Sequence, residues 1–283
     1  MEQDKTYKYT FKSKDHLVTG EYFNITWNKI KTVAKTDIEN IKDISLYYDS
    51  KNYDSFKNEA KGVLDIMYFL TQQIMFRYKL FLIKVHLKRN RILDYGAGSG
   101  KFASYLSKKS FKTSIVEPYN KKTNNVSQLN IDVFENIADI PKSYKYDGVT
   151  LWHVLEHLPN PENILTKIHS ILETNGVLMI AVPNINSLDA KYYESNWAAL
   201  DVPRHIWHFT SKGLISLVES RGFKLTKKHP LWFDAFYISY ISEKNKKSRF
   251  ALIRALFIAI GSNITALINK EYSSLIYIFK RTT

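Results

Sequence analysis

Apolar residues occur along the chain in two alternating patterns. In some segments they form short continuous runs bounded by polar or turn residues, which is typical of buried strands. In others they recur every three or four positions, which is typical of helices with one apolar face. Between residues 91 and 227 the two patterns alternate, as in a parallel sheet covered by helices. We predict strands at 91–94, 112–116, 130–134, 146–151, 177–182, 223–227 and 272–280, and helices at 101–110, 162–172 and 210–220.

The order of these segments indicates the fold class. Strands six and seven are expected to lie side by side and antiparallel. This completes an α/β fold: a seven-stranded doubly wound sheet with strand 7 antiparallel, an N-terminal helical extension and a helical insertion before the last strand. The insertion, 228–271, is far longer than a hairpin needs and is a place for specificity. We therefore divide the chain into an N-terminal extension or lid at 1–56 and a main domain at 57–283.

A long helix is predicted before the first strand of the sheet. Apolar residues recur at helical spacing through 57–88 and form one stripe along the helix. We expect this stripe to face the core rather than a membrane, because charged residues interrupt the segment repeatedly. The stripe consists of Val63, Met67, Leu70, Ile74, Phe81 and Val85.

A second apolar helix is predicted within the insertion. Residues 250–268 approach the length of a membrane span, about 20 residues. Arg254 would cost about 2.5–3.5 kcal/mol at the centre of a bilayer, which favours an amphipathic helix instead. We expect its stripe to pack on the domain, on a substrate cavity or on a second copy, while basic residues before it leave a peripheral membrane contact open. The stripe consists of Ile253, Leu256, Phe257, Ile260, Ile264 and Leu267, and the basic residues are Lys244, Lys246, Lys247 and Arg249.

A glycine-rich turn follows the first predicted strand. Asp94 ends that strand, and Gly96, Gly98 and Gly100 follow at alternate positions. A strand, a glycine turn and a helix together bring bare backbone N–H groups up to a nucleotide-like ligand. The dinucleotide fingerprint would need its third glycine at Lys101. Because a carboxylate in the turn would repel a pyrophosphate, Asp94 favours a cationic ligand.

A second carboxylate ends the second predicted strand. Glu117 comes one helix and one strand after Asp94. Because the carboxyl ends of adjacent parallel strands meet at one edge of a sheet, both carboxylates should lie at that edge. An acid there can accept hydrogen bonds from both ribose hydroxyls of a nucleoside, each worth roughly 1.5–3 kcal/mol.

A third motif follows the fourth strand, where residues 152–161 read W-H-V-L-E-H-L-P-N-P. With the glycine turn and Glu117, this run resembles class I S-adenosylmethionine (SAM)-dependent methyltransferases of type 11/23, in the ubiquinone-biosynthesis-methyltransferase-like branch, which carry H-x-L-E-H-L-x-x-P here. The resemblance implies SAM as cofactor and in-line transfer of its methyl group to a small-molecule, lipid or sugar acceptor. The cofactor-binding residues that it implies are Asp94, Gly96, Ala97, Gly98, Gly100, Glu117, Phe134, Glu135, Trp152 and His153.

Two further segments match the resembled branch. Phe134 and Glu135 would face the adenine ring, and a tyrosine-rich stretch with Tyr47, Tyr48 and Tyr53 would lean over the cofactor. Residues 195–209 carry the branch pattern W-x-x-L-D-x-P-R-H-x-x-H-F. Its chemically active positions here are Trp197, Asp201, Arg204, His205 and His208.

Four residues are the candidate catalytic groups: His153, Arg204, His205 and His208. A histidine can act as a base near neutral pH, and an arginine can hold an anionic group with two parallel hydrogen bonds. An alternative for the 195–209 segment is purely structural. In that alternative Asp201 and Arg204 pair with each other and hold the loop.

The composition excludes several kinds of chemistry. The chain has no cysteine, which rules out disulfides, thiolate metal sites and thiol nucleophiles. His153, Glu156 and His157 fit the inverted zinc-protease signature H-x-x-E-H. That signature belongs inside a long helix, however, and two prolines follow it closely here, so we expect no metal. The net charge of +14 comes from lysines scattered over the whole chain, which makes nucleic acid an unlikely partner.

Three other functions stay open at this point: an NAD-dependent oxidoreductase, a nucleic-acid methyltransferase, and a SAM-binding relative without activity. The expected partner is a small-molecule substrate, and the expected assembly is a monomer or homodimer. Residues 1–20 are polar and contain no apolar signal segment, so we expect a cytoplasmic location.

Overall fold

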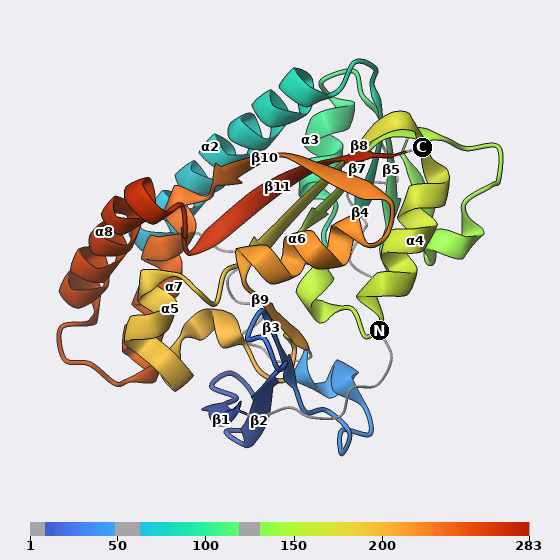
Figure 1. The fold of residues 1–283 in the computed structure, drawn as a ribbon. Coiled ribbons are helices and arrows are strands. Elements are labelled where there is room, and N and C mark those ends of the chain that lie inside the picture. The colour runs from blue at the N-terminus through green and yellow to red at the C-terminus, as the bar shows by residue number, and fades with distance from the viewer. Residues whose placement is uncertain (1–8, 49–62, 119–130, 283) are drawn as a thin grey trace.

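A computed structural model describes residues 9–48, 63–118 and 131–282 (Figure 1). Its main feature is a seven-stranded sheet in the order β10-β11-β8-β7-β4-β5-β6. Strand β11 is antiparallel to both of its neighbours, whereas β8, β7, β4, β5 and β6 are parallel. The predicted doubly wound sheet with an antiparallel seventh strand is therefore confirmed. Its strands are β4 (Arg91–Tyr95), β5 (Lys112–Val116), β6 (Asp132–Phe134), β7 (Tyr146–Trp152), β8 (Leu172–Pro183), β10 (Phe223–Pro230) and β11 (Ser274–Arg281).

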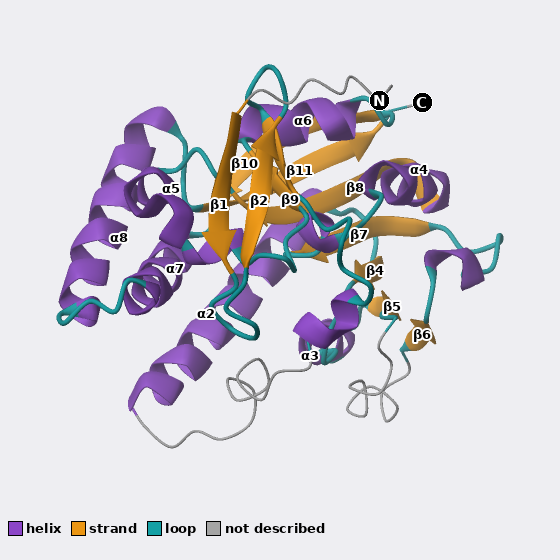
Figure 2. Cartoon of the chain, turned by 90° about the horizontal axis from the view of Figure 1, so that it is seen from below, coloured by secondary structure: helices purple, strands orange, loops and turns teal. Residues whose placement is uncertain are grey.

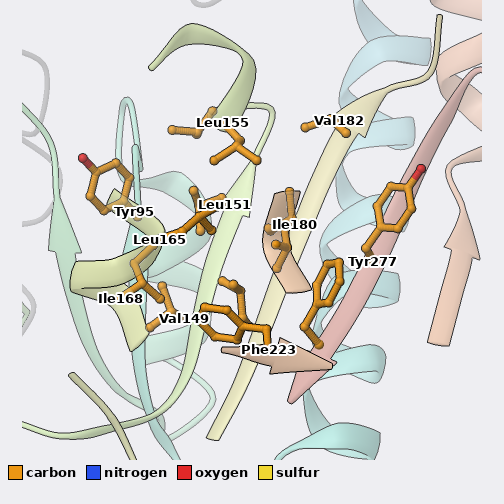
Figure 3. Packing of buried hydrophobic residues seen from close by; sticks show 14 of the residues in the cluster. Tyr95, Val149, Leu151, Leu155, Leu165, Ile168, Ile180, Val182, Phe223 and Tyr277 are labelled. Carbon is orange, nitrogen blue, oxygen red and sulfur yellow. The ribbon is translucent and has the colours of Figure 1, made fainter. Parts of the chain in front are cut away.

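Helices cover both faces of this sheet, and alternate side chains of each strand point to opposite faces. In β8, Met179 packs towards α2 and α3, whereas Ile180 packs towards α4 and α6. Figure 3 shows part of the apolar cluster on the α4 and α6 side of the sheet, where Leu165 and Ile168 of α4 lie over Val149 and Leu151 of β7. The covering helices are α2 (Val63–His86), α3 (Lys101–Ser107), α4 (Pro161–Ile171) and α6 (Ser211–Glu219).

Local signals place the starts of two helices. The side chain of Asn160 accepts a hydrogen bond from the backbone of Asn163, and Pro161 occupies the first turn of α4. Thr210 caps α6 in the same way by accepting from the backbone of Gly213. Because each of these helices begins directly beyond a strand or its connecting turn, the loops that bear the candidate residues lie at the carboxyl ends of the parallel strands.

A second, four-stranded sheet joins the beginning of the chain to the 195–209 segment. Its order is β1-β2-β3-β9, with β1 (Tyr9–Lys14), β2 (Tyr22–Trp27), β3 (Val33–Thr36) and β9 (Trp207–Phe209). Val33 pairs with Phe209 in antiparallel register. This sheet joins residues 9–36 to part of the 195–209 segment, because Trp207–Phe209 forms its fourth strand. Figure 1 shows this small sheet below the main sheet, and the view from below in Figure 2 shows β1 and β2 in front of the main sheet.

The orientation predicted for the stripe on α2 is wrong where the side chains are described. Leu70, Ile74, Phe81 and Val85 are all exposed. The helix packs on the sheet through another face, which is centred on Leu80, Leu82 and Ile83. Because α2 carries apolar residues on more than one side, helical spacing alone could not indicate which side meets the sheet. Val63 and Met67 belong to the part of α2 whose side chains lie outside the described residues.

The insertion consists of α7 (Trp232–Asn245) and α8 (Ala251–Asn269), which pack against each other and against α5 (Leu188–Tyr193) (Figure 1). The expectation that the apolar stripe of α8 packs on the domain is wrong. The face of α8 that meets the protein is made of small residues, and the large apolar residues of the stripe are exposed. Among the residues that the structure describes, α8 is the helix long and apolar enough to cross a membrane by length and composition.

Candidate functional site

The glycine turn has the backbone conformation that its sequence suggests. Gly96, Gly98 and Gly100 have φ angles of 72°, 56° and 70°, in the left-handed region that residues with a Cβ rarely adopt. Gly96 donates its N–H to the carbonyl of Val116 at 2.8 Å, which ties the turn to β5. Gly100 then begins α3. The turn is therefore held against the sheet edge while its outer part faces away from the strands.

The first two glycines have different surroundings. A Cβ on Gly96 would lie 2.5 Å from Cγ2 of Val154, which follows β7, so the turn packs directly on the H-V-L-E-H run. A Cβ on Gly98 would meet no atom of the described residues within 4 Å. The backbone at Gly98 thus borders an open space into which a ligand can approach the N–H groups of the turn.

Two carboxylates lie beside this open space. Oδ1 of Asp94 accepts a hydrogen bond from the Thr150 hydroxyl at 2.7 Å, and Asp94 is only 2% exposed. Glu117 accepts a hydrogen bond from the backbone N–H of Gly98 at 2.7 Å. Burial raises the pKa of Asp94 to about 6, although Thr150 and the charge of Lys79 oppose the shift. A cationic ligand would offset the cost of burying this carboxylate in its charged form. The structure has the predicted arrangement of two acids beside a glycine turn.

Lys79 is a site residue that the sequence reasoning did not single out. It projects from α2, and its Nζ lies 4.4 Å from the centre of the Trp152 ring. Burial lowers the pKa of Lys79 to about 8, against the opposing charges of Asp94 and Asp234. The sequence contains little signal for this role, because Lys79 is one of several charged residues along α2. Nε1 of Trp152 is buried without a hydrogen-bond partner among the described residues.

His153 follows β7 with φ at 56° and is held from three sides. Its N–H donates to the carbonyl of Ala181 at 2.9 Å. Its ring nitrogens lie 3.2 Å from Oδ2 of Asp234 and 3.5 Å from Oε1 of Glu156. Burial alone would lower the pKa of His153, but the two carboxylates outweigh it and raise the pKa to about 9. The inserted helix α7 therefore contributes Asp234 to the site, a residue that local sequence could not connect to His153.

The remaining predicted cofactor contacts lie at the same edge of the sheet. Phe134 ends β6, is half-buried and meets Tyr144 edge-on at 6.4 Å. Glu135 follows it and is exposed, and Ala97 is half-buried within the glycine turn. No ligand contact of these three side chains is tested by the structure, so their adenine and turn roles stay predictions.

The tyrosine-rich stretch is described only in part. Its 3₁₀ turn η1 (Ile44–Tyr47) ends beside Tyr48, whose hydroxyl lies 3.0 Å from Nδ1 of His157. Tyr47 presents its hydroxyl to Glu21 at 3.2 Å. Tyr53 lies outside the described residues. These contacts place Tyr47 and Tyr48 over the 195–209 segment and the H-V-L-E-H run, and a contact with the cofactor stays a prediction.

Arg204 lies at the centre of a buried ion-pair network. It is 1% exposed, and its guanidinium donates to Asp201 at 2.6 Å, to Asp15 at 3.1 Å and to the carbonyl of Tyr47 at 3.2 Å. The pairing of Asp201 with Arg204 is the structural alternative that the sequence left open. Through Asp15 the network also fastens the small sheet to the 195–209 segment. The indole N–H of Trp197 also has a partner within the protein, since its Nε1 donates to Asp189 at 2.8 Å.

His205 and His208 are both buried. Nε2 of His208 lies 2.8 Å from the hydroxyl of Thr36, and burial, with the charge of His205, lowers the pKa of His208 to about 3. Nδ1 of His205 lies 2.8 Å from the carbonyl of Ala199. The structure thus gives Arg204, His205 and His208 packing contacts within the protein. A catalytic role for any of them stays a prediction.

One group of side chains has the composition of a metal site. Ligand atoms of Glu156, His157 and His205 lie within 4.8 Å of one another. Neither oxygen of Glu156 has a hydrogen-bond partner among the residues that the structure describes. Burial lowers the pKa of His157 to about 4, so its ring is neutral near pH 7. His153, which opens the protease signature, is outside this group, although its Nδ1 lies 3.5 Å from Oε1 of Glu156.

A cavity of about 440 Å³ lies between the small sheet and the segment after β8. Phe11 and Trp27 line it from one side, and Ile185 and Trp197 from the other. Asp94, Glu117 and the residues of the glycine turn are not among the residues that line this cavity. This cavity is therefore separate from the open space at Gly98.

Comparison with known proteins agrees with this geometry. A family model described as a methyltransferase domain matches residues 69–228. An uncharacterized protein of Methanocaldococcus jannaschii is 23% identical over 164 residues, which cover 56% of this chain and 77% of that protein.

Solved structures with the same fold include two methyltransferases. Magnesium protoporphyrin IX methyltransferase of Synechocystis PCC 6803, with bound S-adenosylhomocysteine (SAH), has a TM-score of 0.55 and 12% identity, covering 83% of this chain and 97% of that one. The 1,6-didemethyltoxoflavin N1-methyltransferase of Burkholderia thailandensis, with bound 1,6-didemethyltoxoflavin and SAH, has a TM-score of 0.50 and 13% identity, covering 96% and 100%. At 12% and 13% identity, these two similarities show a shared fold.

Proposed function

The chain belongs to the methyltransferase-domain family of class I, SAM-dependent enzymes, and on that premise we propose that it methylates a small-molecule acceptor at the carboxyl edge of its seven-stranded sheet. The observation that carries the proposal is the open space at Gly98, whose N–H donates to Glu117, together with the buried carboxylate of Asp94 close enough to Glu117 to interact with it. This arrangement suits a cationic nucleoside, and SAM is one. When bound, SAM supplies a methyl group on a positively charged sulfur.

The residues around the turn match the functional groups of SAM. Asp94 would accept from the ammonium group, and Glu117 would accept from the ribose hydroxyls. Lys79 would pair with the carboxylate, because α2 brings this cation close enough to Asp94 to interact with it. Phe134 and Glu135 would hold the adenine ring. This assignment gives both the ammonium group and the carboxylate of the cofactor an oppositely charged partner.

The acceptor side of the proposal rests on His153 and Asp234. We assign His153 to removal of a proton from the acceptor, because it follows β7 beside Trp152 and is held in place by Asp234. A carboxylate behind an imidazole fixes the ring orientation and stabilises its protonated form. Binding positions the acceptor, and His153 then takes the proton as the acceptor becomes nucleophilic.

This assignment has a pH signature. Only neutral His153 can accept a proton, and its pKa is about 9, so kcat/KM of the wild type should rise from pH 7 to pH 9. Asp234→Asn removes the larger opposing interaction, so the midpoint of the profile should move towards the ordinary histidine value, near pH 6.5. His153→Gln should lower kcat by roughly 10²–10⁴-fold above pH 9. His229→Gln, a change at a histidine outside the site, should leave the profile unchanged. An identical profile for Asp234→Asn and wild type would contradict the assignment.

The glycine turn offers a test that separates stability from binding. Both Gly96→Ala and Gly98→Ala place a Cβ at positive φ, which costs about 1–2 kcal/mol. The Cβ of Gly96→Ala also collides with Val154, so this variant should melt at the lower temperature. The Cβ of Gly98→Ala points into the open space where the cofactor is expected. This variant should therefore lose more SAM affinity than Gly96→Ala, although it loses less stability. Thermal melts and calorimetric titration with SAM measure the two effects. Equal affinity losses would argue against a cofactor at Gly98.

The overall proposal is tested by calorimetric titration of the protein with SAM, SAH and NAD. We expect SAM and SAH to bind with one site per chain and NAD not to bind. Incubation with SAM carrying a labelled methyl group and fractionated small-molecule extracts should then transfer label to an acceptor. Binding of NAD without binding of SAM would overturn the proposal in favour of the oxidoreductase.

A further inference from the structure

The inserted helix α8 presents its large apolar side chains to solvent. Phe257 is 69% exposed and Ile268 is 86% exposed. On a helical projection the exposed residues form one continuous face that extends over the full length of the helix. They are Leu252, Ile253, Leu256, Phe257, Ile260, Ile264, Leu267 and Ile268. Isolated exposed apolar residues are ordinary, but a contiguous patch of this kind marks an interaction surface.

The opposite face of α8 is built from small residues. Ala255, Ala259, Ser262 and Ala266 are buried. Ser262 donates to Asp189 near the start of α5 at 2.7 Å, and Asn263 donates to the carbonyl of Trp232 on α7 at 3.1 Å. In water a helix normally buries its large apolar residues and exposes polar ones. Small residues towards protein and large apolar residues away from it is the arrangement of helices that face lipid.

Basic residues lie directly before this apolar face. Lys244 lies in the last turn of α7, and Lys246, Lys247 and Arg249 lie in the short connection to α8; all four are exposed. Phe250, also exposed, links them to the helix. An apolar face next to exposed lysines is complementary to a lipid surface with anionic headgroups, because the side chains enter the acyl region while the cations meet the headgroups.

The helix lies along one side of the protein rather than projecting from it (Figures 1 and 2). Its small-residue face is occupied by α7 and α5 along its length. A helix held in this way can be immersed on its outer side only, which fits a helix lying in the plane of the membrane surface and not a span. We propose that the outer face of α8 docks the enzyme on an anionic lipid bilayer. This inference goes beyond methyl transfer and does not depend on it.

The test is flotation of the full chain with vesicles. One set contains phosphatidylcholine alone, and the other contains phosphatidylcholine with about one third phosphatidylglycerol. Wild type should float with the anionic vesicles. The double change Phe257→Glu with Ile264→Glu should reduce binding by at least about tenfold, because it places charge at positions meant for the acyl region. Lys246→Glu with Lys247→Glu should remove the preference for anionic vesicles.

Ile30→Glu provides the matched control, since Ile30 is an exposed apolar residue in a turn of the small sheet. This variant should float like wild type. Circular dichroism and SAM titration of every variant report whether it is folded, and the substituted α8 positions are exposed, so folding should be kept. The proposal is overturned if wild type remains unbound to both vesicle types, or if the α8 variant floats equally well. A stable dimer in lipid-free sedimentation that the α8 variant breaks, without vesicle binding by wild type, would assign the face to a second copy instead.

Discussion

Replacing Glu117 by alanine is expected to weaken SAM binding by roughly 10²–10⁴-fold. Two hydrogen bonds from ribose hydroxyls to a carboxylate, each worth roughly 1.5–3 kcal/mol, account for this range. The side chain already has a fixed orientation, because it accepts the N–H of Gly98 at 2.7 Å. Removing it therefore deletes both the acceptor and an anchor of the glycine turn. Calorimetric titration with SAM and SAH gives the affinity directly.

The control for this change is Glu39→Ala, which removes one negative charge from an exposed position. It should leave SAM affinity within about twofold of wild type. Glu117→Gln separates charge from shape, because the amide keeps the size and one acceptor oxygen, and its affinity should fall between wild type and Glu117→Ala. Wild-type affinity in Glu117→Ala would remove the central support for the cofactor site.

Replacing Arg204 by methionine is expected to destabilise the protein by about 3–5 kcal/mol near pH 7. The change leaves the buried carboxylates of Asp15 and Asp201 without their cation, and breaking a buried ion pair has about this cost. A shift in melting temperature of about 10 °C would correspond to it. Urea unfolding followed by circular dichroism gives the free energy.

The pH dependence of this loss has a definite sign. Burial would raise the pKa of Asp201, but the charge of Arg204 holds it below its ordinary value. The pairing therefore stabilises wild type above the ordinary carboxyl range and is lost as the pH falls through the lowered pKa. In Arg204→Met burial raises the pKa of Asp201 without the opposing charge of Arg204, so protonation relieves the variant at a higher pH than the wild type. The difference between the two proteins should therefore shrink as the pH falls from 7 to 4. Arg89→Met, at an exposed arginine, should show no such difference.

The same variant addresses the catalytic role predicted for Arg204. If Arg204 only joins the small sheet to the 195–209 segment, the folded fraction of Arg204→Met should keep its affinity for SAM and a turnover close to wild type. A loss of turnover at full folding would instead support contact with the acceptor. The measurement is initial rate against folded fraction at a temperature well below the melting transition.

Local sequence pattern predicted the main sheet well, because parallel buried strands are short apolar runs with helices between them. The strand at 112–116 has the predicted bounds, and the helix predicted at 210–220 is α6, Ser211–Glu219. The pattern also placed both carboxylates, since residues at the ends of adjacent parallel strands share an edge. These are properties of neighbouring residues, which a single sequence displays directly.

The same reasoning could not predict which side of a helix faces the protein. Both α2 and α8 carry apolar residues on more than one side, so helical spacing identifies stripes without indicating what each stripe contacts. In α8 the alanines, rather than the larger residues, meet the protein. The contributions of Lys79 and Asp234 to the site were missed for a related reason. They come from α2 and α7, and only the tertiary fold brings those helices to the end of β7.

The 195–209 segment shows where residue type misleads. Histidine and arginine at the carboxyl edge of a sheet suggest chemistry, yet Arg204 and His208 lie in buried contacts with Asp15 and Thr36 from the start of the chain. No local pattern predicts contacts between parts of the chain so far apart. The functional and structural interpretations of these residues are separated only by measurement.

The pairing of Val33 with Phe209 also has a consequence for biosynthesis. Strands β1 to β3 leave the ribosome early, but their fourth strand follows only after most of the main sheet has been made. At roughly 5–20 residues per second, about ten to thirty seconds pass before β9 is made, and the edge of β3 that pairs with β9 stays open during this time. An unpaired edge of this kind is a template for wrong pairing and a target for chaperones. Docking of the chain's beginning onto its middle is therefore expected to be among the last steps of folding.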